Sequence, residues 1–281
     1  MRTLRIIPAT ALVALAIAAC DSPSDAPPRT VRVQLMTATA DGAAASSASG
    51  AAAAGSSAAA PLLLIGSNGT LSLTDLRIIV SRLKLDGVEH ACDTARTRSD
   101  HCKDFTLPPS LVQVPLATSA VTVATGDVRA GTYKEVELRV KNLDINDDGD
   151  EEDMDGDDDH GDRAALAKAL ADARAAFADW PDRASMVAIG TFTPAGDGKQ
   201  PIPFKVYFRA ELKIEMELVP PLVIDDKGAS RTVIITLRPD AWFKASDGKV
   251  VNLSSFDFAT TKRVVEFKPE VKKGFKARHD G

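Results

Sequence analysis

Residues 61–87 read PLLLIGSNGTLSLTDLRIIVSRLKLDG, and this stretch decides the class of fold. Its Ser67-Asn68-Gly69 step is typical of a turn. Beyond the turn, apolar residues recur with a period close to two, and the single slip between Leu73 and Leu76 is typical of a β-bulge. The β-branched content and the final Asp86-Gly87 favour strands over a helix. We therefore predict extended strands in this stretch.

Similar short apolar runs recur along the chain, and Pro220-Pro221 and Asp247-Gly248 mark turns between them. The run KIEMELV alternates strictly, as expected for a sheet with one face in water. About ten strands with short connections predict a mainly β protein, an antiparallel β-sandwich that is either one large sandwich or two adjoining ones. The further predicted strands cover residues 31–35, 111–116, 120–124, 133–143, 185–192, 202–211, 212–219, 230–237 and 249–253.

One segment, residues 163–179, has the pattern of an inserted amphipathic helix. Asp162 is its candidate N-cap, and Pro181 follows its end. Its apolar face is formed by residues with helical spacing, namely Leu166, Leu170, Ala173 and Phe177. We expect this face to cover an edge or an open face of the sandwich.

Shifts in composition divide the chain into several parts. We predict a signal peptide at 1–19, a tether with the first strand and an Ala/Ser-rich disordered loop at 20–61, the first half of the sandwich at 62–143, an acidic loop and helix insertion at 144–181, the second half at 182–268, and a basic C-terminal tail at 269–281.

The N-terminus reads MRTLRIIPATALVALAIAAC, with two arginines before a short apolar run. The step Ile17-Ala18-Ala19-Cys20 resembles the lipobox of bacterial lipoprotein signals. This resemblance implies that Cys20 becomes the first mature residue, is acylated and anchors the protein to a lipid bilayer of the cell envelope, at the periplasmic face or the cell surface. The alternatives are an ordinary signal peptide with an incidental cysteine or an inner-membrane anchor. The apolar run is shorter than the roughly 20 residues that span a bilayer.

Charge is distributed unevenly along the chain. From residue 20 onward, 32 Lys or Arg face 39 Asp or Glu. Residues 144–162 hold twelve Asp or Glu and no Lys or Arg, whereas residues 262–278 hold seven Lys or Arg against two Glu. Single-sign blocks of this kind are typical of solvated faces or tails. Because the acidity is local, the overall charge says nothing about nucleic acid, but the export signal argues against a nucleic-acid partner.

Two cysteines, Cys92 and Cys102, remain if Cys20 is acylated. An even number of cysteines in an oxidising compartment favours a disulfide that closes the polar loop between them, worth roughly 3 kcal/mol. The alternative is a zinc site that includes His90 and His101. Its spacing is unfavourable, because His101 and Cys102 are adjacent, whereas zinc ligands are typically paired two to four residues apart.

The acidic segment is the sharpest candidate for a metal site, with Ca²⁺ as the expected cofactor. Its oxygen-rich sequence matches the start of a calcium loop in two registers, although both lack the glutamate at position 12. The first register runs from Asp144 and the second from Glu151. The alternative is a solvated loop that binds cations diffusely. The candidate ligands are Asp144, Asn146, Asp148, Asp150, Asp153, Asp155 and Asp162.

Several strings resemble a group of uncharacterised exported bacterial lipoproteins: NGTLSLTDLRIIVSRLKLDG, DFTLPPSLVQVPL, AGTYKEVELRVKNL, VAIGTF, ELVPPLVI and DAWFKASDGKVVNL. Residues 68–143 also resemble a DUF4382 domain, most clearly at Gly131-Thr132-Tyr133. The resemblance implies a prealbumin- or immunoglobulin-like β-sandwich. These are packing and turn motifs, and they imply no activity.

Enzyme motifs are scarce, and the four histidines lie in polar segments or at the C-terminus. Ser81 and Lys84 match S-x-x-K, but within a strand they would face opposite sides. We therefore predict no enzyme but a binding or structural module with an unknown protein or glycan partner. The alternative is a hydrolase, or a carbohydrate-binding protein with a site of dispersed loop residues. The candidate aromatic residues for a sugar platform are Trp180, Tyr207, Trp242 and Phe243.

Overall fold

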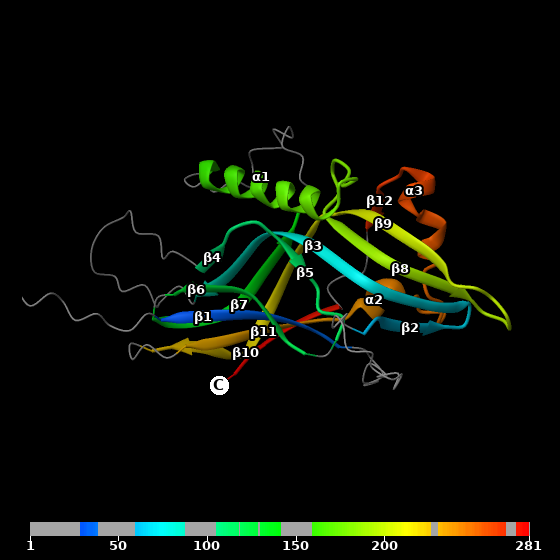
Figure 1. Ribbon diagram of the computed structural model, residues 1–281. Helices are drawn as coiled ribbons and strands as arrows, with labels where there is room; N and C mark the ends of the chain where they lie inside the picture. The colour runs from blue at the N-terminus through cyan, green and yellow to red at the C-terminus, as the bar shows by residue number, and fades with distance from the viewer. Residues whose placement is uncertain are drawn as a thin grey trace, which may run out of the picture.

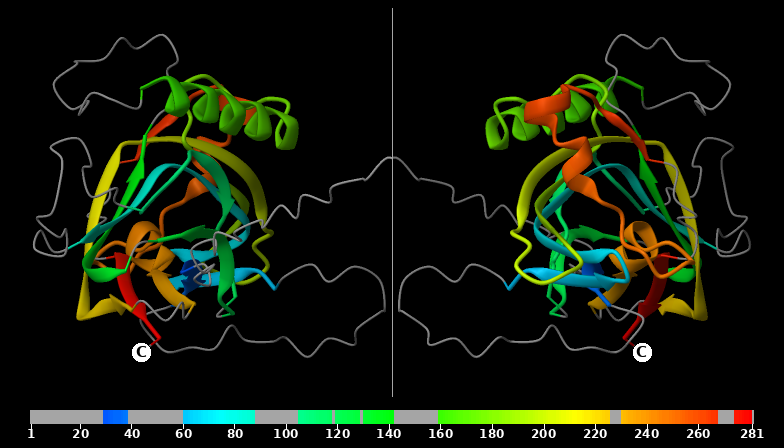
Figure 2. Two further views of the ribbon diagram at one scale, coloured as in Figure 1. Left: turned by 90° about the vertical axis from the view of Figure 1, so that its left-hand side faces the viewer. Right: turned by 90° about the vertical axis from the view of Figure 1, so that its right-hand side faces the viewer.

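Two β-sheets enclose one apolar core in the computed structural model (Figure 1). The structure describes residues 29–38, 60–87, 105–117, 119–128, 130–141, 159–225, 230–267 and 274–280. The protein is mainly β and has the predicted sandwich-like architecture. Figure 2 shows the two sheets and the main helix from the two ends of the molecule.

The smaller sheet has four strands in the order β13-β11-β1-β6. The larger sheet has nine strands, with the path β10-β7-β3-β8-β9-β12 and with β2, β4 and β5 also paired to β3. The strands of the smaller sheet are β1 (Thr30–Thr37), β6 (Val121–Asp127), β11 (Arg231–Leu237) and β13 (Phe275–His279). Those of the larger sheet are β2 (Leu62–Gly66), β3 (Gly69–Gly87), β4 (Phe105–Leu107), β5 (Ser110–Gln113), β7 (Gly131–Val140), β8 (Met186–Pro194), β9 (Ile202–Ala210), β10 (Leu212–Ile224) and β12 (Val265–Phe267).

Strand β3, which lies in the stretch 61–87 where strands are predicted, organises the larger sheet. It pairs with β2 across the predicted turn, with β8 along residues 69–78 and with β7 along residues 80–87. The pairing with β8 shifts register between Leu73 and Asp75, which confirms the predicted bulge. At this bulge Gly190 faces Leu73, and a Cβ on Gly190 would overlap the carbonyl oxygen of Ser72, so only glycine allows the close approach.

The core lies between the inner faces of the two sheets. Alternation along each strand buries one side only: Val31, Val33 and Leu35 of β1 are at most 1% exposed, whereas Arg32 between them is exposed. Leu71 of β3 and Leu138 of β7 belong to the same cluster. The predicted period-two pattern therefore identifies the core side of most strands correctly.

The sheets are mixed, which corrects the prediction of purely antiparallel sheets. β1 is parallel to β11, and β12 is parallel to β9. The two predicted halves of the sandwich also do not correspond to the two sheets, because β3 and β7 share the larger sheet with β8, β9 and β10. Parallel pairing joins strands that are far apart along the chain. Local sequence patterns therefore do not show which distant strand a given strand pairs with, or in which direction.

Helix α1 spans Asp159–Ala176 and covers part of the outer face of the larger sheet (Figures 1 and 2). Its Leu170 and Ala173 pack in a second, smaller apolar cluster with Ile79, Val187 and Tyr207. This confirms the predicted buried face. The helix begins earlier than predicted, so Asp162 lies within it rather than at its N-cap, and Phe177 lies just beyond its last residue.

Three further expectations about local structure are wrong. Pro220-Pro221 is no turn but lies inside β10, where the pairing with β7 shifts register between Glu217 and Leu222. Residues 249–253 form a single bridge between Val250 and Lys244 rather than a strand. The basic C-terminal tail contributes β13, which pairs with β11. Short helical elements not predicted from the sequence are α2 (Pro239–Phe243), η3 (Leu253–Phe256) and α3 (Phe258–Thr261).

Within the described ranges, none of the helices has the length and apolar character needed to cross a membrane.

Candidate functional site

The residues that the sequence analysis singles out for chemistry fall mostly outside the described ranges. Helix α1 contains Asp162, whose backbone is described but whose side chain is not. The acylation, disulfide and calcium hypotheses therefore stay predictions. The residues outside the described ranges are Cys20, Cys92, Cys102, Asp144, Asn146, Asp148, Asp150, Asp153 and Asp155.

The four candidate aromatic residues form no shared sugar platform, because all four are buried. Trp180 and Tyr207 pack in the small cluster under α1, whereas Trp242 and Phe243 belong to the main core. Trp242 has 8% of its surface exposed and the other three have 5% or less. Tyr207 lies in strand β9, Trp242 and Phe243 lie in helix α2, and Trp180 lies in the segment after α1. Each of the four therefore fills a core and does not form a binding surface.

A first cluster of titratable groups joins the turn after α1 to strand β9. The Tyr207 hydroxyl donates to Asp179 Oδ1 at 2.7 Å, and Lys205 Nζ lies 2.5 Å from Asp179 Oδ2. Partial burial opposes ionisation of Asp179, but the hydrogen bonds from Lys205 and Tyr207 together lower its pKa below the usual value. Burial and the same carboxylate raise the pKa of Tyr207, so it stays protonated as a donor.

Aromatic rings surround this Tyr207. The ring centroids of Trp180 and Phe258 lie 5.3 and 4.9 Å from that of Tyr207, both in edge-to-face geometry. Every polar atom of the cluster thus has a structural partner within it, and we interpret the cluster as a lock that holds the segment after α1 on the sheet.

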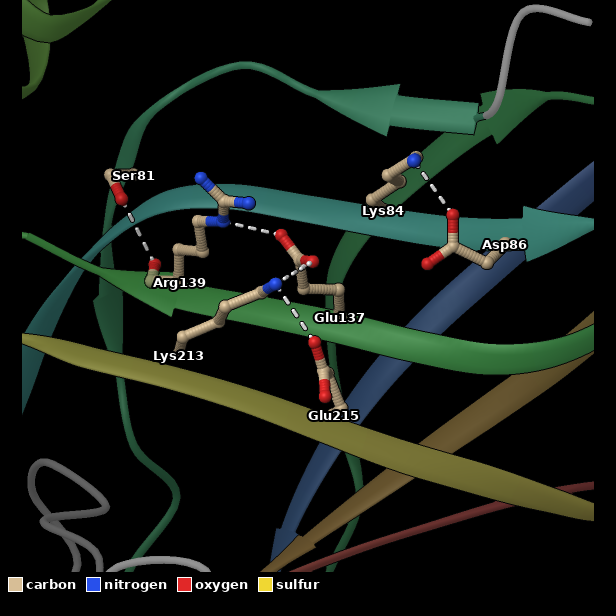
Figure 3. A network of polar contacts seen from close by, with 7 residues as sticks. All are labelled: Ser81, Lys84, Asp86, Glu137, Arg139, Lys213 and Glu215. Atoms are coloured by element: carbon tan, nitrogen blue, oxygen red, sulfur yellow. Dashed lines mark hydrogen bonds and ion pairs between the residues drawn. The ribbon is translucent and has the colours of Figure 1, made fainter. Parts of the chain in front are cut away.

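The second cluster is a regular array of charged side chains on the outer face of β10, β7 and β3. Figure 3 shows six of them: Lys84, Asp86, Glu137, Arg139, Lys213 and Glu215. The strand registers place these side chains in three rows of three. One row is entirely basic, one is mixed and one is entirely acidic. We call the array the charged grid; its rows are Arg82, Arg139 and Lys213; Lys84, Glu137 and Glu215; and Asp86, Glu135 and Glu217.

Glu137 is the buried centre of the grid, with only 7% of its side chain exposed. Its Oε1 lies 2.5 Å from Arg139 Nε and its Oε2 lies 3.5 Å from Lys213 Nζ. Lys213 also pairs with Glu215 at 2.8 Å, so one lysine bridges two carboxylates (Figure 3). The hydrogen bond to Glu215 and the charges of Glu137 and Glu215 raise the pKa of Lys213.

The acidic row carries like charges side by side. Glu135 lies opposite Asp86 on one side and Glu217 on the other. Burial, followed by the charges of Glu215 and Asp86, raises the pKa of Glu135 above its ordinary value. The basic row also places like charges side by side, because Arg82 lies opposite Arg139. Arg82 Nε is buried and has no hydrogen-bond partner among the residues that the structure describes. A complementary charge at either end of the grid would therefore be favoured.

Ser81 and Lys84 do not form the pair that an S-x-x-K nucleophile needs. The Ser81 hydroxyl donates to the carbonyl of Arg139 at 3.2 Å, and Lys84 Nζ pairs with Asp86 at 2.7 Å (Figure 3). The register between β3 and β7 shifts at Ser81. Among the residues that the structure describes, no group of three or more His, Cys, Asp or Glu is placed to hold a metal ion.

Two of the undescribed segments are continuous with the grid strands. The segment that contains Cys92 and Cys102 follows β3 directly after Asp86 and Gly87, at the acidic end of the grid. The segment that contains the candidate calcium ligands follows β7 soon after Arg139, at the basic end. The grid itself was not predicted, because KIEMELV and similar runs show which residues face water but not which residues on other strands lie beside them.

No family model, no curated protein and no solved structure matches this chain.

Proposed function

We propose that this chain is a lipid-anchored protein of the bacterial cell envelope and that its β-sandwich is a non-catalytic binding module. The observation that carries the binding role is the charged grid. Nine charged side chains with a graded pattern, basic to acidic, occupy the outer face of three paired strands. Such a pattern favours a partner surface whose charges run in the opposite order, from acidic to basic. Complementary charges steer association and fix the register of the two surfaces.

The geometry of the grid favours binding over catalysis. Lys213 and Glu215 are 53% and 49% exposed, so the site is an open face. Catalytic groups instead work in water-excluded pockets where their pKa values are tuned to accept or release a proton. Glu137 is held in place by Arg139 and Lys213, and this pairing makes it a positioning group.

The anchor is proposed from the sequence. The lipobox ending in Cys20 and the resemblance to exported lipoproteins with a DUF4382-like sandwich support it, and the sandwich-like fold is compatible with that resemblance. Acylation with two or more chains is sufficient for stable membrane attachment.

Mutation of the lipobox cysteine tests the anchor. We expect Cys20→Ala to lose the lipid mass and to appear in the soluble or unprocessed fraction, whereas Cys102→Ala, which removes a different cysteine, keeps both the mass shift and the membrane fraction. Normal membrane fractionation of the Cys20→Ala chain, without a mass shift in the wild type, would disprove acylation.

Site-specific crosslinking tests the binding role. A photoreactive residue at Lys213, in the exposed part of the grid, is expected to form a discrete adduct with an envelope protein or glycan in cells. The same residue at Lys199, an exposed position in the β8–β9 connection, is the control. The proposal fails if both positions give the same adducts, or if replacing Arg82 and Arg139 with Glu leaves the Lys213 adduct unchanged.

We also propose that the acidic segment binds Ca²⁺, with an affinity of roughly 10⁻⁴–10⁻³ M because both registers lack the bidentate glutamate. Twelve carboxylates in nineteen residues repel each other, and a divalent ion relieves this repulsion. Millimolar Ca²⁺ should raise the melting temperature of the wild type but not of a variant with Asp144, Asp148, Asp153 and Asp155 changed to Asn. Equal shifts in both proteins would assign the segment as a solvated loop.

A further inference from the structure

The first strand brings the N-terminal part of the chain to the smaller sheet. β1 begins at Thr30 and lies between β11 and β6, in the interior of that sheet. Only nine residues separate Cys20 from Thr30. Even a fully extended chain of this length spans at most roughly 35 Å. If Cys20 is acylated, as proposed above, the smaller sheet stays close to the bilayer surface.

The outer face of the smaller sheet is basic. Strand alternation turns Arg32, Gln34 and Met36 of β1 outward, and the register places Lys276 and Arg278 of β13 on the same side. Arg32, Lys276 and Arg278 are all exposed. The remaining outward positions are uncharged over most of the sheet: Thr122, Thr125, Thr232, Ile234 and Thr236. We call these outward residues, together with the three cations, the basic face.

Among the described residues, the two acids on the outer face of the smaller sheet lie at its corners and already accept hydrogen bonds. Asp127 accepts from the Thr30 hydroxyl at 3.5 Å, and Asp280 accepts from the backbone N–H of Thr232 at 2.7 Å. Arg32 lies on β1 in the interior of the sheet, and Arg278 of the edge strand β13 reaches across β11 so that its Nη2 lies 3.7 Å from Met36 Sδ. Lys276 stays on the edge strand, where it lines a small pocket with Glu215 and Glu217 of β10. The net charge of the interior is therefore positive, although the chain as a whole is acidic.

Exposed aliphatic side chains border the basic face. Val219 and Val223 of β10 are 77% and 55% exposed. Between them, the carbonyl of Pro220 accepts a hydrogen bond from His279 Nε2 at 2.7 Å, which holds this part of β10 against the end of β13. Cations combined with exposed aliphatic groups are typical of surfaces that lie on anionic bilayers.

We infer that the basic face docks on an anionic lipid surface and sets the orientation of the anchored domain. The smaller sheet lies on the side of the molecule opposite α1 (Figures 1 and 2), so docking points α1 away from the bilayer. The charged grid belongs to the other sheet and stays available to a partner. The acyl chains supply the affinity, and the basic face supplies the orientation, because each cation near an anionic surface adds a short-range attraction.

Vesicle binding without the anchor tests this inference separately from acylation. The probe is the chain from residue 20 with Cys20→Ala, sedimented with phosphatidylglycerol vesicles at low salt, with phosphatidylcholine vesicles as the neutral reference. We expect selective binding to phosphatidylglycerol. Changing Arg32, Lys276 and Arg278 to Gln should weaken this binding by about 100-fold, since each cation contributes about a factor of five.

The matched control changes three exposed cations outside the basic face, Lys199, Lys244 and Arg263, to Gln. It alters the net charge equally and is expected to keep the binding within about twofold. Equal binding to both lipids, or equal weakening of both triple variants, overturns the docking proposal. Capture of a protein by the basic face without lipid binding would instead assign the face to a protein partner. Acylation is decided by the lipid mass on Cys20, which none of these vesicle results changes, so the two proposals fail independently.

Discussion

The outer face of the larger sheet has two regions that differ sharply. Under α1, Ile79, Val187 and Tyr207 are fully buried in an apolar cluster. A few residues further along β3, past the register shift at Ser81, the same face carries Arg82, Lys84 and Asp86. One strand thus changes the character of its outer face from apolar to charged along its length.

This difference shows that the residue composition of a sheet face depends on whether another element of the protein covers it. The region under α1 excludes water, and burying apolar side chains there is favourable. The grid has no such apolar cluster, and its stability depends on pairing charges whose partners are half-exposed. The first region is expected to be sensitive to any introduced charge, and the second to be sensitive only at its buried centre.

The largest expected effect is in the covered region. Leu170→Asp places a charge without a partner among apolar side chains, and we expect the free energy of unfolding to fall by at least about 3 kcal/mol. Denaturant titration measures this change. The control, Ala171→Asp, lies on the exposed side of α1 and is expected to lower stability by about 0.7 kcal/mol, the difference in helix propensity between Ala and Asp. Equal stabilities of the two variants would mean that α1 does not cover the sheet.

The next effect is at the centre of the grid. Glu137→Gln leaves Arg139 and Lys213 next to each other without the shared carboxylate. We expect a loss of about 2 kcal/mol, less than for a fully buried pair because both cations are partly exposed. Glu215→Gln, which removes an exposed partner of the same Lys213, should cost less than about 0.5 kcal/mol. If the two variants lose the same stability, Glu137 contributes no more to the stability of the grid than the exposed Glu215 does.

The boundary of the covered region is tested by Tyr207→Phe, which keeps the ring contacts and removes the donor to Asp179. We expect a loss of about 1 kcal/mol at neutral pH. Because the pKa of Asp179 is lowered on folding, its contribution is present above its unfolded pKa of about 4 and is lost as the pH falls through the lower folded value. The difference between wild type and variant should therefore shrink in acid. A difference that does not change with pH would contradict this assignment.

The smallest effect is in the acidic row. The raised pKa of Glu135 means that its charged form is disfavoured in the folded protein. Its contribution is most favourable below its unfolded pKa and is lost as the pH rises through the higher folded pKa. Glu135→Gln should thus stabilise the protein at pH 7 by about 0.5 kcal/mol. Asp197→Asn, in an exposed turn, is the control, and a destabilised Glu135→Gln protein would show that the row is held by attraction instead.

Local patterns predicted the strands better than the connections between them. The alternation in residues 69–87 identified β3, its core side and its bulge, because each of these depends on neighbouring residues only. Pro220-Pro221 was interpreted as a turn, yet the sheet accommodates it as an irregularity within β10. Strand β13 comes from a short basic segment near residue 275. Its pairing with β11 depends on residues about forty positions away in the sequence.

The candidate site was less predictable than the fold. Alternation placed charged residues of β3, β7 and β10 on the water side, but the grid exists only because the registers align Arg82, Arg139 and Lys213 in one row. A shift of one residue in either pairing would destroy the rows while leaving each sequence unchanged. The aromatic residues were mispredicted in the opposite sense. Their side chains are of the kind that forms a sugar platform, but the tertiary structure buries them in two apolar clusters.

The amino-acid sequence by itself determined the mainly β class, the inward residues of the strands and the apolar face of α1, because these follow from the periodicity of hydrophobic residues along a single element. Only the tertiary structure decided the parallel pairing of β1 with β11, the recruitment of the basic C-terminus into a sheet, and the order of charges in the grid. The physical reason is that contacts between distant strands are selected by the packing of the whole core, in which no short segment contains both partners.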